Sequence, residues 1–181
     1  MTDGQRVLVV AATERELVPV DGADNLVCGI GPIEAAVATA RALAERRPGA
    51  VLHVGIAGAS GLAPLELVLG SEAVYCDAAG PFVPARALPD PSLLERLRAA
   101  FPDAHVAPIG TSARVGGGTV SVEAMEGFAV LRAAELAGVP AVEARVVSNE
   151  LVEPDRSLWR FDDAFARLAE LLPRLVAAAR G

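Results

Sequence analysis

The sequence contains no lysine, and all sixteen of its basic residues are arginine. This absence excludes a lysine Schiff base and a P-loop lysine, because both need the primary amine of a lysine side chain. Aromatic residues make up only 4% of the 181 residues, although 52% are apolar. The interior therefore has to be filled mainly by alanine, valine and leucine.

Histidine and cysteine are also scarce. The chain has two histidines, His53 and His105, and two cysteines, Cys28 and Cys76. None of them lies in a cluster with the spacing of a zinc site, so we expect no metal. No serine occupies a nucleophile elbow, which argues against a Ser-His-Asp triad. We interpret the histidines as structural or solvated, and the cysteines as buried free thiols of a reducing compartment.

Long apolar runs are missing as well. The apolar runs are too short to span a membrane, and the one at residues 7–12 is too short for a signal peptide. The formal net charge of -7 argues against nucleic acid and against an anionic membrane surface as partners. We therefore expect a cytoplasmic protein that binds neither.

Strand-like and helix-like segments alternate along the chain, which predicts an α/β fold with a parallel or mixed sheet. The length is typical of one domain, here residues 1–181. We expect strands at residues 6–12, 25–28, 50–56, 70–76 and 141–147, and helices at 33–47, 93–100, 123–137 and 162–180. Residues 77–91 and 113–121 are rich in proline and glycine, so we interpret them as loops near a site.

The expected helix at 123–137 and strand at 141–147 form one unit with polar groups at both ends. Gly138 and Pro140 stop the helix, and the strand ends in Ser148 and Asn149. Ligands of α/β folds bind at the carboxyl ends of strands. Because Glu126 lies near the start of the helix, we expect Glu126 and Asn149 to face one pocket.

Other polar positions allow more than one interpretation. Glu16 directly follows the first expected strand, where a solvated carboxylate at a helix start is an ordinary alternative to a catalytic one. Gly29 and Gly31 imitate part of a dinucleotide fingerprint, but the third glycine and the acidic residue that holds a ribose are missing. A tight turn between a strand and a helix is therefore favoured there.

Five segments, taken in order, resemble the purine nucleoside phosphorylase and nucleosidase family: AATEREL, GIG, HVGIAG, VEAMEG and GVPAVEARVVSN. Within that family, the continuation NELVEPDR before Trp159 resembles the futalosine hydrolase branch. The resemblance implies a three-layer fold in which helices flank a mixed central sheet. It also implies a purine nucleoside substrate, no cofactor, and a homodimer or larger homo-oligomer.

The resemblance assigns roles to individual residues. Glu16 would position and deprotonate the attacking water, and Glu126 would bind the ribose hydroxyls while Met125 packs on the sugar. Asn149, which follows Ser148, would contact the purine at N7 and at its six-position. Further candidates for substrate contact are Gly58 on the nucleophile side and the aromatic residues Phe82 and Trp159.

Chemistry supports these assignments independently. Cleavage of an N-glycosidic bond passes through a cationic ribosyl species, which a nearby carboxylate stabilises. A second carboxylate beside water can act as a general base. The oxygen of Asn149 can accept from a protonated N7 while its NH2 donates to a six-oxo group, so hypoxanthine suits it better than adenine. An unpaired donor facing a donor costs about 1–3 kcal/mol.

The predicted function is hydrolysis of futalosine to release hypoxanthine, in menaquinone biosynthesis by the futalosine route. No arginine in HVGIAGASG would hold phosphate, so water is the expected nucleophile. The carboxylate of futalosine would need an arginine, for which Arg86, Arg156 and Arg160 are candidates. The alternatives are a nucleosidase for methylthioadenosine and S-adenosylhomocysteine or for inosine, and a relative that binds a nucleoside without cleaving it.

Overall fold

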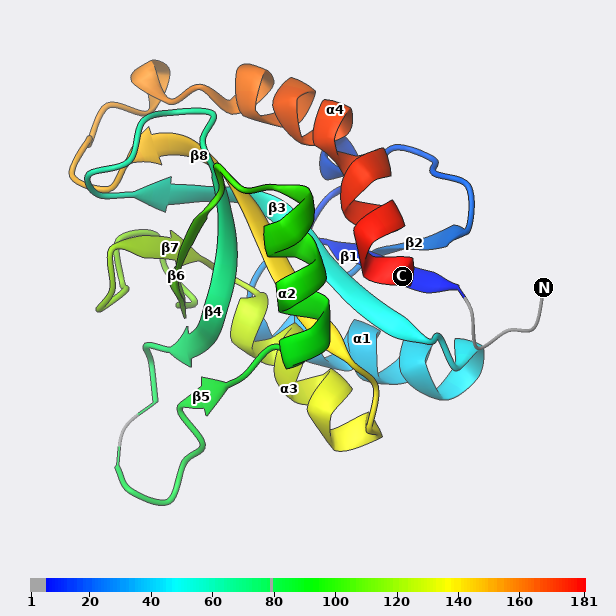
Figure 1. Ribbon diagram of the computed structural model, residues 1–181. Helices are drawn as coiled ribbons and strands as arrows, with labels where there is room; N and C mark the ends of the chain where they lie inside the picture. The colour runs from blue at the N-terminus through cyan, green and yellow to red at the C-terminus, as the bar shows by residue number, and fades with distance from the viewer. Residues whose placement is uncertain (1–5, 79) are drawn as a thin grey trace.

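The computed structural model describes residues 6–78 and 80–181 (Figure 1). Its strands are β1 (Val7–Ala11), β2 (Ala23–Val27), β3 (Ala50–Ala59), β4 (Leu67–Tyr75), β5 (Arg86–Ala87), β6 (His105–Thr111), β7 (Val122–Ala124) and β8 (Ala141–Glu150). Its helices are α1 (Pro32–Arg46), α2 (Pro91–Ala100), α3 (Gly127–Ala137) and α4 (Phe161–Arg180), with short 3-10 turns η2 (Glu14–Glu16) and η3 (Arg156–Leu158). No helix among these described residues is long and apolar enough to cross a membrane.

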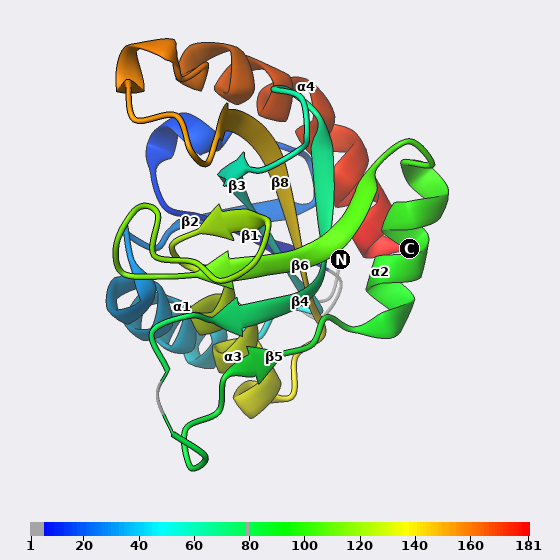
Figure 2. The ribbon, with the colours of Figure 1, turned by 90° about the vertical axis from the view of Figure 1, so that its left-hand side faces the viewer.

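The strands form one mixed sheet in the order β2-β1-β3-β7-β6-β4-β5, and β8 pairs with both β3 and β4. The pairs β3–β8, β8–β4, β4–β6, β6–β7 and β7–β3 therefore close a circuit of five strands. Each of the five contributes to one apolar cluster, which contains Ala57, Val68, Ile109, Val122 and Val147. Figure 2 shows β4 and β6 from the side on which they cross in front of β3 and β8.

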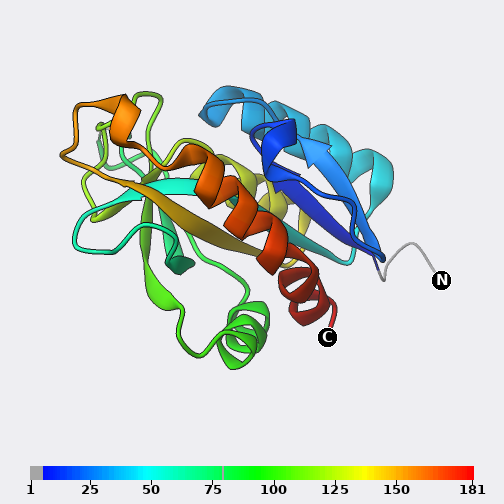
Figure 3. The same cartoon turned by 90° about the horizontal axis from the view of Figure 1, so that it is seen from above.

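Helices cover both faces of the sheet, which confirms the expected three-layer fold. Helices α2 and α4 pack on one face through a leucine-rich core that includes Leu93, Leu168 and Leu172. Helices α1 and α3 pack on the other face, where Leu43 and Leu131 belong to the second core cluster. Figure 3 shows the long α4 lying across the strands, with α1 beyond the opposite face. The sheet is thus shielded on both sides, as the continuous apolar strands β1 and β3 require.

The expected helix at residues 123–137 is wrong at its start. Residues Val122–Ala124 form strand β7, and the helix begins only at Gly127, with Glu126 as its N-cap residue. Glu123 pairs with Gly58 of β3 on one side and with Gly110 of β6 on the other. Strand pairing on both sides outweighs the helix propensity of this stretch, which local sequence cannot reveal.

Two other expectations were also incomplete. Strand β6 was not expected, although it contributes the buried Ile109 and Thr111. Strand β8 is three residues longer than the expected strand at 141–147, since pairing with β3 continues to Glu150. This extension matters because it carries Ser148 and Asn149 inside a strand instead of a turn.

Candidate active site

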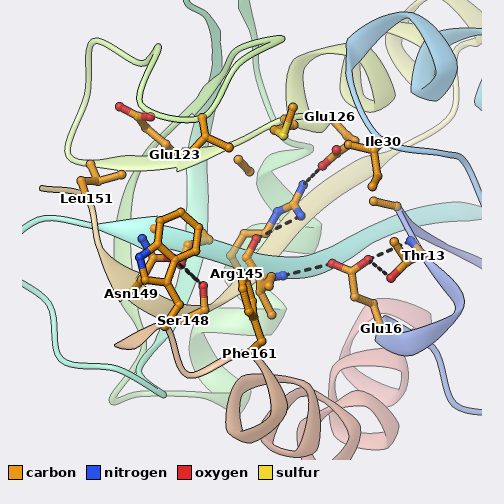
Figure 4. Close-up of a pocket in the computed structure, with 18 of the residues that line it drawn as sticks. Thr13, Glu16, Ile30, Glu123, Glu126, Arg145, Ser148, Asn149, Leu151 and Phe161 are labelled. Carbon is orange, nitrogen blue, oxygen red and sulfur yellow. Dashed lines mark hydrogen bonds and ion pairs between the residues drawn. The ribbon is translucent and has the colours of Figure 1, made fainter. Parts of the chain in front are cut away.

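One pocket, of about 320 Å³, lies at the carboxyl ends of β1, β3 and β8, against the start of α4 (Figure 4). Strands, the turn before α1 and α4 all contribute to its wall. Its lining includes seven of the eight predicted site residues: Glu16, Gly58, Met125, Glu126, Ser148, Asn149 and Trp159. Segments more than a hundred residues apart in sequence therefore meet at one cavity, where ligands of α/β folds bind.

Glu16 is buried at the end of the turn that follows β1. Its Oε2 accepts hydrogen bonds from the backbone N–H of Thr13 at 2.8 Å and from the Thr13 hydroxyl at 2.9 Å. Its Oε1 accepts from the backbone N–H of Ile56 at 3.3 Å. Three donors thus fix the carboxylate in the pocket wall, which a solvated helix-start residue would not need.

Glu126 is held on another side of the same pocket. Its Oε1 accepts from the backbone N–H of Gly31 at 3.0 Å, and its Oε2 lies 3.5 Å from Arg145 Nη2. Gly31 adopts a φ of 95°, which only glycine adopts readily. The Gly29–Gly31 turn therefore serves the pocket by presenting a donor to Glu126.

Arg145 is fully buried between the carboxylates and also lines the pocket. Its Nε donates to Glu143 Oε1 at 2.8 Å, and its Nη2 contacts His53 Nε2. A side chain at Gly55 would overlap Arg145 Nη1 and come within 2.7 Å of Glu16 Oε1. The guanidinium and the Glu16 carboxylate therefore share the space above a glycine.

His53 is buried beneath this cluster and is neutral. Its Nδ1 lies 2.9 Å from the Val10 carbonyl oxygen, so Nδ1 carries the proton and donates. Its Nε2 is then free to accept from Arg145. Burial, reinforced by the positive charge of Arg145, holds the pKa of His53 well below its ordinary value of 6.5. The expectation of a structural histidine holds, but this residue also supports a functional cluster.

Asn149 owes its place to an irregularity in β8. The register between β3 and β8 shifts after Ala57, so Gly58 pairs with Asn149 and Ser148 is an extra residue. Side chains of successive strand residues normally point to opposite faces, but this bulge lets both Ser148 and Asn149 line the pocket. A side chain at Gly58 would come within 2.9 Å of Asn149 Nδ2.

The amide of Asn149 has a defined orientation. Its Nδ2 donates to the Glu150 carbonyl at 3.0 Å, and its Oδ1 accepts from the Ser148 hydroxyl at 2.8 Å. A flipped amide would point its oxygen at the Glu150 carbonyl, so the orientation follows from the two partners. One N–H and one lone pair of the amide are left over for a ligand.

Of the two aromatic residues predicted to contact substrate, only Trp159 lines the pocket. It donates from Nε1 to the Glu153 carbonyl at 3.1 Å, and meets the Phe161 ring edge-on at 5.4 Å. Phe82 is not brought to this pocket, because its side chain is 96% exposed in the loop between β4 and β5. Met125 lines the pocket next to Glu126.

The structure also separates the candidate arginines. Arg86 donates to both oxygens of Glu72, and Arg160 donates to Asp163; neither lines the pocket. Arg156 does line it, and so does Arg114, which was not considered from the sequence. Within residues 6–78 and 80–181, neither Arg114 nor Arg156 pairs with a carboxylate.

Arg145, Glu143 and His53 are the site residues that sequence reasoning missed. Residues 141–147 were interpreted as an apolar run, although a glutamate and an arginine stand two apart within it. In a strand, that spacing places both charges on one face. A pair of opposite charges inside a buried strand is therefore the signal that could have indicated a functional cluster.

The arrangement defines a class of chemistry. Two carboxylates, Glu16 and Glu126, and one amide, Asn149, face a single cavity, and Arg145 in its wall pairs with Glu126. No group of three or more potential metal ligands exists among the described residues. Such a set can activate water, stabilise a cationic sugar and hydrogen-bond a leaving base.

Comparison with known proteins agrees with this class. The profile of the Phosphorylase superfamily matches residues 14–179, so the chain belongs to that superfamily. Two futalosine hydrolases are relatives of this chain. The one from Streptomyces coelicolor is 34% identical over 188 residues, covering 86% of this chain and 79% of the relative. The one from Acidothermus cellulolyticus is 35% identical over 186 residues, covering 86% and 76%.

Solved structures share the fold. The futalosine hydrolase of Helicobacter pylori superposes with a TM-score of 0.84 at 16% identity, covering 96% of this chain and 97% of that one. The methylthioadenosine/S-adenosylhomocysteine nucleosidase of Streptococcus pneumoniae gives 0.83 at 18% identity, with coverage of 96% and 99%. At these identities the likeness concerns the fold alone.

The buried neutral His53 predicts a dependence of stability on pH. Below pH 6.5 the unfolded chain takes up a proton that the folded chain excludes, so stability falls with falling pH by at most about 1.4 kcal/mol per unit. His53→Asn cannot take up this proton. Urea unfolding between pH 7 and 5 should therefore show a smaller acid loss in His53→Asn than in the unsubstituted protein.

The comparison between the two proteins isolates His53. Burial raises the pKa of Glu143, which acts in the opposite sense because the folded chain then binds a proton above pH 4.5. Glu143 is present in both proteins, so its contribution largely cancels in the difference. Parallel stability curves for the two proteins would contradict the assignment of a depressed pKa to His53.

Proposed function

We propose that the 181 residues act as one nucleosidase domain that hydrolyses the N-glycosidic bond of futalosine and releases hypoxanthine, a step in menaquinone biosynthesis by the futalosine route. The observation that carries the proposal is the convergence of two buried carboxylates, Glu16 and Glu126, with Asn149 on one cavity. The futalosine hydrolases among the relatives support the choice of substrate.

Glu16 is the proposed general base. Its carboxylate is held by Thr13 and Ile56, so it can point a lone pair at a water without losing its own orientation. Removal of a proton from that water generates the nucleophile that attacks the anomeric carbon. Because the donors are preorganised, little reorganisation accompanies the step.

Glu126 is the proposed partner of the sugar. A carboxylate accepts from the ribose hydroxyls and stabilises positive charge that develops on the ring. Gly31 occupies one lone pair of Oε1 and Arg145 lies 3.5 Å from Oε2, which leaves one lone pair on each oxygen for the sugar. Met125, next to it, supplies an apolar surface on which a sugar can pack.

Asn149 is the proposed contact to the base. After its bonds to Ser148 and Glu150, the amide has one lone pair for a protonated N7 and one N–H for a six-oxo group. An adenine would place its six-amino donor against that same N–H. The pairing supports hypoxanthine as the leaving base.

Water is the proposed nucleophile in preference to phosphate. Arg15 is the one arginine in the turn that carries Glu16, and it does not line the pocket. It forms an ion pair with Asp162 and packs on the Phe165 ring. Arg145 is already surrounded by Glu126, Glu143 and the carboxylate of Glu16. A phosphate anion next to Glu16 would meet a like charge, and Arg15 and Arg145 are already paired with carboxylates.

One assay tests the proposal. Futalosine, methylthioadenosine and inosine are each incubated with the protein, with and without phosphate, and the released base is measured. We expect hypoxanthine from futalosine without any need for phosphate. Glu16→Gln should lower kcat by about 10²–10⁴-fold, because the general base is lost, while futalosine binding measured by calorimetry persists.

Each other result has a defined meaning. Adenine release from methylthioadenosine would contradict the role given to Asn149 and favour the alternative nucleosidase. Activity that survives in Glu16→Gln would contradict the assignment of the base. If none of the three nucleosides is cleaved although futalosine binds, the chain is a nucleoside-binding relative without turnover.

We further propose that Arg156 binds the carboxylate of futalosine, with Arg114 as a second cation. Both line the pocket and lack acidic partners within the described residues, and the Arg156 guanidinium lies 5.4 Å from the centre of the Trp159 ring. An aromatic wall beside a cation suits an aromatic acid such as a benzoate. Arg86 and Arg160 are less suited because Glu72 and Asp163 already neutralise them.

Arg156→Ala should raise KM for futalosine by roughly tenfold or more, the effect of one lost charge-assisted hydrogen bond. Inosine has no carboxylate, so its kinetic constants should change little. Arg160→Ala is the matched control, since Arg160 stands four residues away but pairs with Asp163. Equal effects of Arg156→Ala on both nucleosides, or none on futalosine, would refute the assignment.

A homodimer is proposed from the surface of α1. Ile33 and Val37 stand one helical turn apart and are exposed, although both are apolar. Ile30, just before α1, is 61% exposed and also lines the pocket, so an apolar surface continues from α1 to the pocket wall. A second copy on this face would cover the patch and help to close the pocket.

Val37→Glu should shift the protein from dimer to monomer in sedimentation, because it places a charge in the proposed interface. Val106→Glu, on the partly exposed β6, is the control and should leave the mass unchanged. A monomeric unsubstituted protein would refute the interface. The cytoplasmic location expected from the sequence stays a prediction.

A further inference from the structure

Glu143 is a buried carboxylate that the proposed mechanism does not use. It stands two residues before Arg145 on β8, is fully buried and does not line the pocket. Its Oε1 accepts from Arg145 Nε at 2.8 Å, but its Oε2 has no hydrogen-bond partner among the described residues. A buried, half-satisfied carboxylate is costly, so its presence needs a reason.

The distances around Arg145 indicate that reason. The bond from Arg145 Nε to Glu143 is short, whereas the separations from Arg145 to Glu126 Oε2 and to the Ile56 carbonyl are both 3.5 Å. Separations of 3.5 Å lie at the outer limit of hydrogen bonding. Glu143 and His53, which do not line the pocket, therefore fix the position of the guanidinium. The groups that face the pocket do not.

The space for Glu143 is also specific. A side chain on Gly127 would overlap both carboxylate oxygens of Glu143. Gly127 is the first residue of α3 and directly follows Glu126, the N-cap. The partial positive charge at a helix start favours an anion there and offsets part of the cost of the unpartnered oxygen. The same short segment thus carries the sugar-binding carboxylate and leaves room for Glu143.

We propose that Glu143 is a positioning residue: it fixes the Arg145 guanidinium so that Arg145 holds Glu126 in the orientation that the ribose needs. The proposal rests on the proposed function, since Glu126 is assigned to the sugar there. Glu143 touches no substrate and acts only through Arg145. Its loss should therefore affect the transition state, where the geometry of Glu126 matters, more than substrate binding.

The kinetic test compares two substitutions in the full-length protein. Glu143→Ala frees the guanidinium, so kcat on futalosine should fall by roughly tenfold to a hundredfold, with KM changed by less than about threefold. Glu143→Gln keeps an oxygen that accepts from Arg145 Nε and should restore kcat to within about threefold of the original value. Gly127→Ala, which displaces the Glu143 carboxylate, should resemble Glu143→Ala.

Thr39→Val supplies the matched control. Thr39 on α1 has the other buried side-chain oxygen without a partner among the described residues, and it does not line the pocket. Its substitution should change stability but not kcat of the folded fraction. Unchanged kcat in Glu143→Ala, or an equal loss in Glu143→Gln and Glu143→Ala, would overturn the positioning role.

A second readout does not depend on turnover. In protein labelled with 15N-arginine, the Arg145 Nε–H should give an NMR signal that exchanges slowly with water, because a carboxylate binds it and burial shields it. Glu143→Ala should abolish this protection, and Glu143→Gln should keep it. If no nucleoside is cleaved but protection follows this pattern, the proposed function fails and the positioning role stands. Unchanged protection in Glu143→Ala would refute the role itself.

Discussion

Burial of the Arg145 guanidinium is the constraint on which the pocket depends, because a desolvated cation costs several kcal/mol unless carboxylates surround it. Glu143 and Glu126 lie within 4 Å of it, and Glu16 shares the space above Gly55 with it. These glutamates would be equally unfavourable in isolation. Each charge of the cluster is therefore stable only because the others are present, which holds the two pocket carboxylates in place before any ligand arrives.

Glycines make this density of charge possible. Gly55 leaves room for Arg145 and Glu16, Gly127 for Glu143, and Gly58 for Asn149. A methyl group at any of these positions would collide with a polar side chain of the cluster or the pocket. The glycine-rich segments are thus used for close packing of side chains on backbone, in addition to the turn geometry that Gly31 supplies.

The closed circuit of five strands explains how the halves of the pocket meet. Strand β3 brings Ile56 and Gly58 between Glu16 on one side and β8 on the other. Strand β7, only three residues long, pairs with β3 and β6 and so places Glu126 next to the end of β3. A proposed base, a sugar contact and a base-selective amide are thereby carried by separate elements of one rigid sheet, which suits a reaction that needs fixed geometry.

The sequence by itself determined the α/β class and most helices, because apolar periodicity is a local property. The pocket side chains Glu16, Glu126 and Asn149 came from motifs that resemble a known family. Tertiary structure decided the rest. Pairing on two sides made Val122–Ala124 a strand where propensity favoured helix, and a bulge turned Ser148 and Asn149 to the same cavity. Phe82 is exposed on the surface and lies outside that cavity. Arg86 and Arg160 are paired with acidic residues, whereas Arg156 has no such partner among the described residues. Arg145 has one partner close to it in sequence, Glu143, but His53 and Glu126 reach it from other segments. The role of a charge in a strand is therefore clear only when its neighbours in space are known.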